Sequence, residues 1–262
     1  MVTSDAAVSI FLQPGWTLVG LVALLCAVIT AALWFALFRW PGVAPARTPQ
    51  AAYHVSATAL FALFLSFTAS DAWRRSDAAY AALLREASEL STLAQVADRM
   101  AEGRERGVAA DALRGVLRDY LALTLREEWG RRNVTGSDSA SLALDRGRGL
   151  ALAGLAGPDA ALWRVAYERI EGANQARTAR LVAGGVYGDA LRWAGLFLLF
   201  TVGSGAIGLA HLDRPRAAVP AMATYAAAAC VALCVVALNE HPYAGWDATT
   251  PDWLEQLLAR LG

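Results

Sequence analysis

Two cysteines in the last apolar segment are the first residues whose type and spacing suggest chemistry. Cys230 and Cys234 are four positions apart, so a helix places both thiols on one face. His241 follows seven positions later, and thiolates with an imidazole suit Cu(I) or Zn. The alternative is that both cysteines are small packing residues in a membrane helix. Because these three groups supply too few ligands, we expect no metal site.

Arginines recur along the last helix predicted in the polar part of the chain, at positions Arg164, Arg169, Arg177 and Arg180. A row of guanidinium groups attracts anions. Arg177 and Arg180 are therefore candidate anion-attracting residues. The alternative is a solvated helix face on which Glu168 and Glu171 balance the charge.

The remaining titratable residues suggest no catalysis. Asp71 precedes Arg74 and Arg75 by three and four positions, which favours a helical ion pair over a proton relay. His54 and His211 lie at the ends of apolar segments, as interfacial anchors do. The sequence has no glycine-rich phosphate loop, Ser-His-Asp arrangement or paired carboxylates. We therefore predict a protein that is not an enzyme, with no catalytic residue and no cofactor.

Composition indicates a membrane protein with one polar region. The chain has 262 residues, of which 56% are hydrophobic and 18% charged, and the charged residues lie mostly between positions 71 and 192. The formal net charge is zero, so the composition gives no case for nucleic-acid binding.

Residues 50–102 contain neither glycine nor proline, although the chain has 22 glycines and 9 prolines. Since helix interiors exclude both, this run predicts one helix about 75 Å long at 1.5 Å per residue. A bilayer core needs only about 30 Å of it. The later part has apolar residues at the alternating spacing of a packed helix, namely Tyr80, Leu83, Ala87, Leu90, Ala94 and Ala97.

Hydropathy and helix breaks predict an all-α integral membrane protein. Four transmembrane helices are expected at residues 16–40, 53–73, 191–212 and 220–238. A soluble helical bundle is inserted between spans two and three, with later helices at 108–132, from Ser139 or Ser141 to about 155, and onward from Pro158. The expected domains are residues 1–73 (first helix pair), 74–190 (bundle), 191–238 (second helix pair) and 239–262 (tail).

The order of these elements resembles the bestrophin-like family of bacterial and plant membrane proteins. Similar motifs occur at Trp73, Asp77, Arg85-Glu86-Ala87 and Leu90; at Tyr120 and Glu127-Glu128-Trp129; at Arg177, Arg180 and Leu181; and at Glu240-His241-Pro242-Tyr243 with Gly245. Asp and Phe of the family pattern are Glu240 and Tyr243 here. The resemblance implies a relation to bestrophins, which are pentameric chloride channels with a cytosolic helical domain.

Two functions from different classes follow. The first is a homo-oligomeric anion channel in membrane lipid that conducts small anions, with five copies as the first expectation. Span two would line its pore through Thr58, Phe61, Leu65 and Thr68. Copies would meet through the hydroxyl-rich span two or the glycine face of span three. The alternative is a non-transporting sensor, scaffold or accessory subunit that acts through its helical domain.

The short loops carry a positive bias that predicts sidedness. They hold four arginines and one acid, namely Arg39, Arg47, Arg214, Arg216 and Asp213. Cytoplasmic loops carry such an excess, whereas long domains translocate largely regardless of charge. We expect a bacterial inner-membrane protein whose helical domain lies outside the cytoplasm, although the resemblance implies the opposite side.

Reporter fusions test this sidedness directly. An alkaline phosphatase fused after Gly136 is expected to be active, because that enzyme folds only outside the cytoplasm. A silent fusion there, with an active cytoplasmic reporter at the same position, contradicts the prediction.

Overall fold

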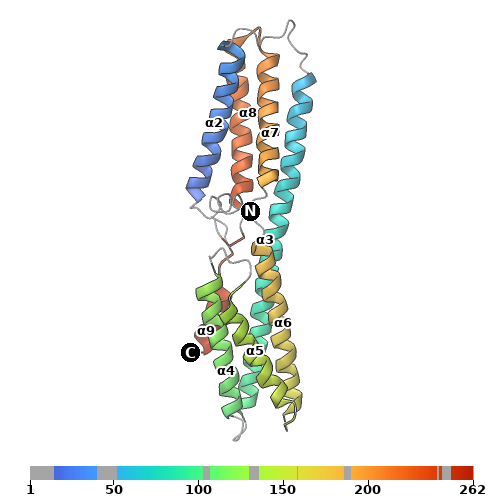
Figure 1. Ribbon diagram of the computed structural model, residues 1–262, viewed down its shortest axis with the longest axis vertical. Coiled ribbons are helices and arrows are strands. Elements are labelled where there is room, and N and C mark those ends of the chain that lie inside the picture. Colours follow the sequence, from blue (N-terminus) through green and yellow to red (C-terminus); the bar gives the residue numbers. More distant parts are fainter. Residues whose placement is uncertain are drawn as a thin grey trace. The chain divides into compact units, whose positions relative to one another are not determined.

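A computed structural model describes residues 15–39, 52–102, 107–129, 136–157, 159–185, 190–240, 242–243 and 249–261. Every regular element among them is helical, and these residues contain no strand. The elements are α2 (Gly15–Arg39), α3 (Ala52–Ala101), α4 (Gly107–Leu123), η1 (Thr124–Glu128), α5 (Asp138–Gly154), α6 (Ala160–Gly185), α7 (Ala190–Ala210), α8 (Pro215–Leu238) and α9 (Asp252–Leu261) (Figure 1).

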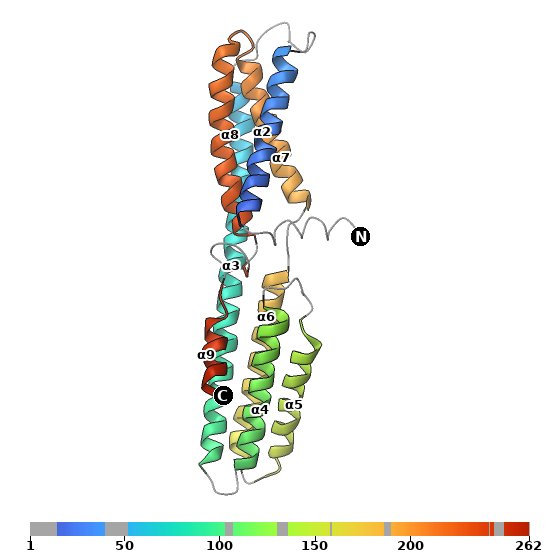
Figure 2. The ribbon, with the colours of Figure 1, turned by 90° about the vertical axis from the view of Figure 1, so that its left-hand side faces the viewer.

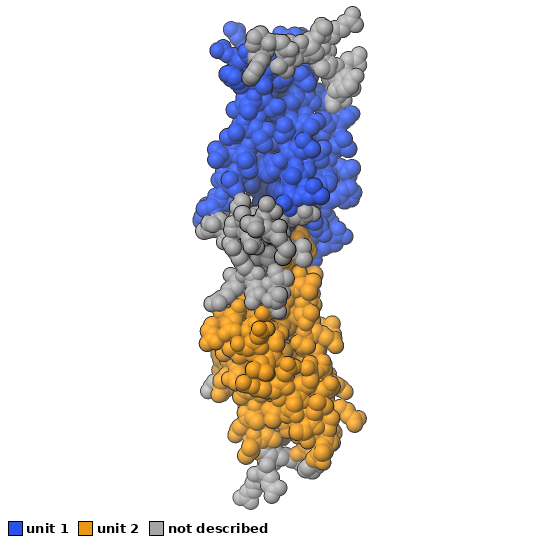
Figure 3. All heavy atoms as spheres, viewed as in Figure 1, with its two compact units in different colours: residues 1–74, 187–241, 245–247 blue, residues 75–186, 242–244, 248–262 orange. Residues whose placement is uncertain are grey.

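The chain divides into two compact units (Figure 3). Unit 1 comprises Met1–Arg74, Tyr187–His241 and Gly245–Asp247. Unit 2 comprises Arg75–Val186, Pro242–Ala244 and Ala248–Gly262. Helix α3 contributes its first half to unit 1 and its second half to unit 2.

Unit 1 contains α2, α7, α8 and the first half of α3, which run lengthwise beside one another (Figures 1 and 2). Its core is aromatic where α3 meets α7 and α8. Phe61 lies 6.3 Å from Phe200 and 6.0 Å from Tyr225 between ring centroids. Helices α2, α3 and α8 and the helical stretch containing α7 are each long and apolar enough to cross a membrane.

Unit 2 is a helical bundle with a separate apolar core. The second half of α3 supplies Leu83, Leu90, Leu93 and Met100, which α4, α5 and α6 cover with leucine, alanine and Ile170. Helix α9 also belongs to this core, because Leu254 and Leu257 are buried in it. The end of α9 receives a hydrogen bond from Arg118 Nη2 to the Leu261 carbonyl oxygen.

Helix α3 confirms the interpretation of the glycine- and proline-free run, since it is continuous over 50 residues. Of its six predicted seam residues, Leu83, Leu90, Ala94 and Ala97 are buried, whereas Tyr80 is exposed. The exposure of Tyr80 is a correction to the predicted seam. Residues 186–189, through which α6 was expected to continue into span three, lie outside the described part of the chain.

Two predicted helix ends were wrong in detail. The cap of α5 is Ser137, whose Oγ accepts a hydrogen bond from Ala140 N at 3.1 Å, and neither Ser139 nor Ser141 holds that position. The helix predicted at 108–132 changes to a π-helical turn at Thr124. The structure also places α9 in unit 2, although the sequence analysis had assigned residues 239–262 to a separate tail.

Close packing between α5 and α6 suggests a matched pair of glycine substitutions. A Cβ added at Gly154 would lie 2.3 Å from the Trp163 ring, whereas one at Gly149 would have no neighbour within 4 Å. Gly154→Ala is expected to destabilise unit 2 by about 1–3 kcal/mol through overpacking. Gly149→Ala is expected to stabilise it by about 0.5–1 kcal/mol, because alanine restricts the unfolded chain. Denaturant unfolding followed by tryptophan fluorescence measures both, and equal effects would contradict the packing described.

A buried ion network as the candidate functional site

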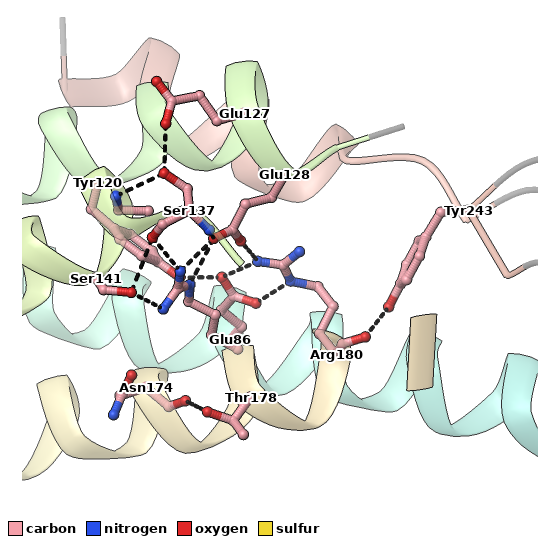
Figure 4. Close-up of polar contacts among 12 residues, drawn as sticks. Glu86, Tyr120, Glu127, Glu128, Ser137, Ser141, Asn174, Thr178, Arg180 and Tyr243 are labelled. Atoms are coloured by element: carbon pink, nitrogen blue, oxygen red, sulfur yellow. Dashed lines mark hydrogen bonds and ion pairs between the residues drawn. The ribbon is translucent and has the colours of Figure 1, made fainter. Parts of the chain in front are cut away.

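The most unusual polar feature of unit 2 is a group of four buried charges. Glu86 on α3, Glu128 at the end of η1, and Arg177 and Arg180 on α6 are each at most 5% exposed. Burying a charge costs free energy unless an opposite charge and hydrogen bonds compensate it. Three ion pairs link the four side chains in the order Arg177, Glu128, Arg180 and Glu86 (Figure 4).

Arg180 joins the two carboxylates. Its Nε lies 2.6 Å from Glu86 Oε2, and its Nη2 lies 2.8 Å from Glu128 Oε2. The guanidinium also lies over the Trp129 ring, 5.5 Å from the ring centroid. The flat, multi-donor guanidinium suits this bridging role, which a lysine could not reproduce.

Arg177 completes the group from one turn earlier on α6. Its Nε donates to Glu128 Oε1 at 3.0 Å, and its Nη2 donates to the Ser137 carbonyl oxygen at 2.9 Å. Its Nη1 donates to Ser141 Oγ at 3.0 Å. The network therefore also fixes the start of α5, and its two positive and two negative charges sum to zero.

Tyr120 supplies a neutral donor from α4. Its hydroxyl donates to Glu86 Oε1 at 2.5 Å. Burial and the neighbouring Glu86 carboxylate raise the pKa of Tyr120 well above its usual range, so the phenol stays protonated. Burial alone would raise the pKa of Glu128, but the hydrogen bond from Arg177 and the charge of Arg180 outweigh it and lower that pKa.

Local backbone features position Glu128 and Ser137. The π-helical turn, closed by Trp129 N donating to the Thr124 carbonyl at 3.2 Å, ends at Glu128. Gly136 has φ +78°, the left-handed region that glycine adopts without strain. A Cβ there would lie 2.8 Å from Arg177 Nη2. Glycine is therefore required both for the turn and for access of the arginine.

Tyr243 holds the segment after α8 against the same part of unit 2. Its hydroxyl donates to the carbonyls of Ala79 on α3 and Arg180 on α6, at 3.5 and 3.3 Å. Its ring packs edge-on against Trp129 at 5.1 Å. Tyr243 thus contacts α3 and α6 and packs against the ring that covers the Arg180 guanidinium.

This geometry corrects the expectation for Arg177 and Arg180. They do not form an exposed anion-attracting row, because both are buried and engaged by carboxylates. Their partners are Glu128 and Glu86 and not the Glu168 and Glu171 considered from the sequence. The cluster is closed and electrically neutral, which suits a structural junction among α3, α4, α5 and α6.

Three of the four predicted pore-lining residues pack inside unit 1. Phe61 and Thr68 are each 4% exposed, and Leu65 packs against the core of unit 1. Thr58 Oγ1 donates to the His54 carbonyl at 2.8 Å. Within one chain, Phe61, Leu65 and Thr68 therefore pack against neighbouring helices.

The hydroxyl groups of span two also have local partners. Ser66 Oγ and Thr68 Oγ1 donate to the carbonyls of Ala62 and Phe64, four residues earlier, at 2.8 and 2.9 Å. These hydroxyls therefore need no partner chain. The glycine face of α7 is likewise occupied within the chain, since a Cβ at Gly203 or Gly208 would collide with Tyr225 or Leu37.

Asp71 forms an ion pair with α7 that the sequence did not predict. Its Oδ2 lies 2.8 Å from Arg192 Nη1 on α7, within unit 1. The pair ties the first half of α3 to the start of α7.

Most residues of the network belong to the motifs that carried the family resemblance. Glu86, Tyr120, Glu128 and Trp129 come from two of those motifs, and Arg177, Arg180 and Tyr243 from two others. A family profile described as a bestrophin-like domain matches residues 22–252. The chain belongs to the bestrophin-like family.

A solved structure shares the fold. A crystal structure of a bacterial bestrophin homologue from Klebsiella pneumoniae, determined for a point mutant, aligns with a TM-score of 0.61 at 13% identity. The alignment covers 94% of this chain and 96% of that one. A search of curated proteins finds no match. Family and apolar helices together establish a membrane protein with the bestrophin fold.

The lowered pKa of Glu128 predicts acid sensitivity. A carboxyl whose pKa is lowered by folding contributes stability above its unfolded pKa, near 4.3, and loses that contribution as pH falls through the folded pKa. The unfolding midpoint in denaturant is expected to fall between about pH 5 and pH 3. Glu128→Gln is expected to be less stable at pH 7 and to show a smaller acid loss. An unchanged acid loss in the variant would contradict the assignment to Glu128.

Proposed function

We propose that this bestrophin-like membrane protein is a homo-oligomeric anion channel, with chloride as the expected ion. The observation that carries the proposal is the fold shared with a bestrophin homologue over nearly the whole of both chains. The resemblance implies chloride conduction and assembly around an axis. Non-enzymatic function is consistent with this family, and the closed network leaves its carboxylates no open substrate position.

Unit 2 is proposed to be the domain outside the bilayer. Its outward side chains include many charges, with exposed ion pairs such as Arg114 to Asp98 at 2.7 Å and Arg148 to Asp145 at 2.7 Å. Such charges are costly against lipid and cost little in water. The arginines of the short loops support a position of this domain outside the cytoplasm, in a bacterial inner membrane.

We place the proposed pore lining on the exposed face of α3 and not at the four residues expected from the sequence. Leu60, Leu63 and Phe67 follow one another at helical spacing and are 57%, 54% and 66% exposed within one chain. Ser56 and Ser70 extend the same face at the next turns. Lipid can cover such a face, but copies arranged around an axis would make it a narrow apolar constriction, which gates by dewetting.

This arrangement fits the family expectation of five copies. Four spans are too few to surround a pore easily, so the proposed channel requires several copies. The contact surfaces between copies are proposed on the exposed parts of α3, because the α7 glycines pack within the chain. Native mass spectrometry in mild detergent measures the number of copies.

Two phenylalanines on different faces of α3 allow the effect of pore lining to be measured separately from the effect of packing. Phe67→Ala is expected to raise chloride flux into liposomes several-fold, because a smaller side chain widens and wets the constriction. Phe61→Ala is expected to lower the melting temperature, because Phe61 contacts Phe200 and Tyr225. Leu198→Ala, at an exposed position on α7, is the control and should change neither property.

Chloride flux from purified wild-type protein in liposomes tests the proposal itself. Flux that exceeds that of protein-free liposomes supports the channel. No flux from an intact, folded preparation that is monomeric or dimeric would favour the alternative, a sensor, scaffold or accessory subunit acting through unit 2. Raised flux in Phe61→Ala but not in Phe67→Ala would instead restore the original pore candidates.

A further inference from the structure

All three cysteines of the chain lie together inside unit 1. Cys26 belongs to α2, and Cys230 and Cys234 belong to α8, which runs beside α2 (Figures 1 and 2). The Cys230 and Cys234 sulfurs are 4.0 Å apart, and Cys26 belongs to the same buried cluster, close enough to Cys230 for the two thiols to interact. All three are free thiols. The channel function uses none of them.

The helix geometry selects which pair can form a bond. Residues four apart on one helix have Cβ atoms about 5–6 Å apart, whereas a disulfide requires about 3.5–4.5 Å. Cys230 and Cys234 are therefore poorly placed to join each other. Cys26 lies on a neighbouring helix, so the fixed separation of Cβ atoms within one helix does not apply to Cys26 and Cys230. A bond between these two would connect α2 to α8.

A buried tyrosine hydroxyl, that of Tyr225, lies near this pair of cysteines. Its hydroxyl is buried and has no hydrogen-bond partner in the described part of the chain. Tyr225 lies close enough to Cys26 for the two groups to interact electrostatically. The thiolate is the reactive form of cysteine. A phenol that can donate a hydrogen bond to it assists attack on a disulfide.

We propose that Cys26 and Cys230 form an oxidisable dithiol that a lipid-soluble disulfide converts into a bond between α2 and α8. Cys230 is partly exposed and reacts first, whereas Cys26 is buried. The Cys230 thiolate attacks the disulfide, forms a mixed disulfide and releases one thiol. The Cys26 thiolate then displaces the second thiol, and in this proposal the Tyr225 hydroxyl has the role of donating a hydrogen bond to this thiolate as it forms.

The electrons and protons balance in this exchange. Two cysteine thiols are oxidised to one disulfide, and the incoming disulfide is reduced to two thiols that take up the two protons. The bond would hold the two helices together whatever the protein conducts. The inference therefore does not depend on the channel function.

The competing explanation is that the cysteines are small apolar packing residues. In that case a lipid-soluble disulfide would leave them unreacted or attach to each accessible thiol separately. A bond between the two helices would then not form. The two explanations differ in which products are found.

The test uses the full-length protein in lipid nanodiscs with one equivalent of 4,4′-dithiodipyridine per chain. The expected result is release of two pyridinethiones per chain and loss of two hydrogens from the intact mass. Peptide mapping without reduction should find one joined peptide pair containing Cys26 and Cys230. Stable pyridyl adducts, no reaction, or a bond between Cys230 and Cys234 would each overturn the proposal.

Matched variants distinguish a loss of thiol reactivity from a loss of folded protein. Cys234→Ser is expected to keep the bond, and Cys26→Ser is expected to stop the reaction at the mixed disulfide on Cys230. Tyr225→Phe is expected to slow bond formation about tenfold, because one hydrogen bond to a charged group is lost. An unchanged rate would overturn the role of Tyr225. Melting temperatures close to that of the wild type establish that each variant is folded.

Discussion

Two arginines buried in the helical unit require two carboxylates, and much of that unit follows from this requirement. Arg180 fixes the rotation of α6 against α3 through Glu86, and Arg177 fixes the start of α5 through Ser137. Glu128 serves both arginines. Because an unpaired buried charge is costly, the four groups must come together or not be buried at all. The π-helical turn and the positive φ of Gly136 both serve this arrangement.

The sequence predicted the backbone better than the partners. The absence of glycine and proline from residues 50–102 predicted α3 almost to its ends, because these two residue types act locally on the backbone. Pairing of Arg180 with Glu86 joins α6 to α3, and neither periodicity nor spacing along one helix reveals a contact of that kind. The family motifs contained these residues, but a motif does not state which residues touch. Only the fold shows that four separate motifs form one network.

The sequence also could not show which face of α3 packs inside the chain. A membrane helix is apolar on every side, so spacing alone cannot distinguish a face that packs from a face that is exposed. Phe61 and Phe67 fit helical spacing equally well, yet one is 4% and the other 66% exposed. Serine and threonine gave no better signal, because hydroxyls on α3 bond to their own helix. Neighbouring helices determine the difference between the two faces.

The position of α3 around an axis is the central claim, and cross-linking between copies measures it most directly. Phe67→Cys and Leu198→Cys are each introduced where Cys26, Cys230 and Cys234 have been replaced by alanine. A thiol-reactive cross-linker with a reach of about 10 Å, close to the separation of packed helices, is then applied in membranes. A ladder of linked copies is expected for Phe67→Cys, and none is expected for Leu198→Cys. Unlinked chains for Phe67→Cys, or a ladder only for Leu198→Cys, would contradict the central claim.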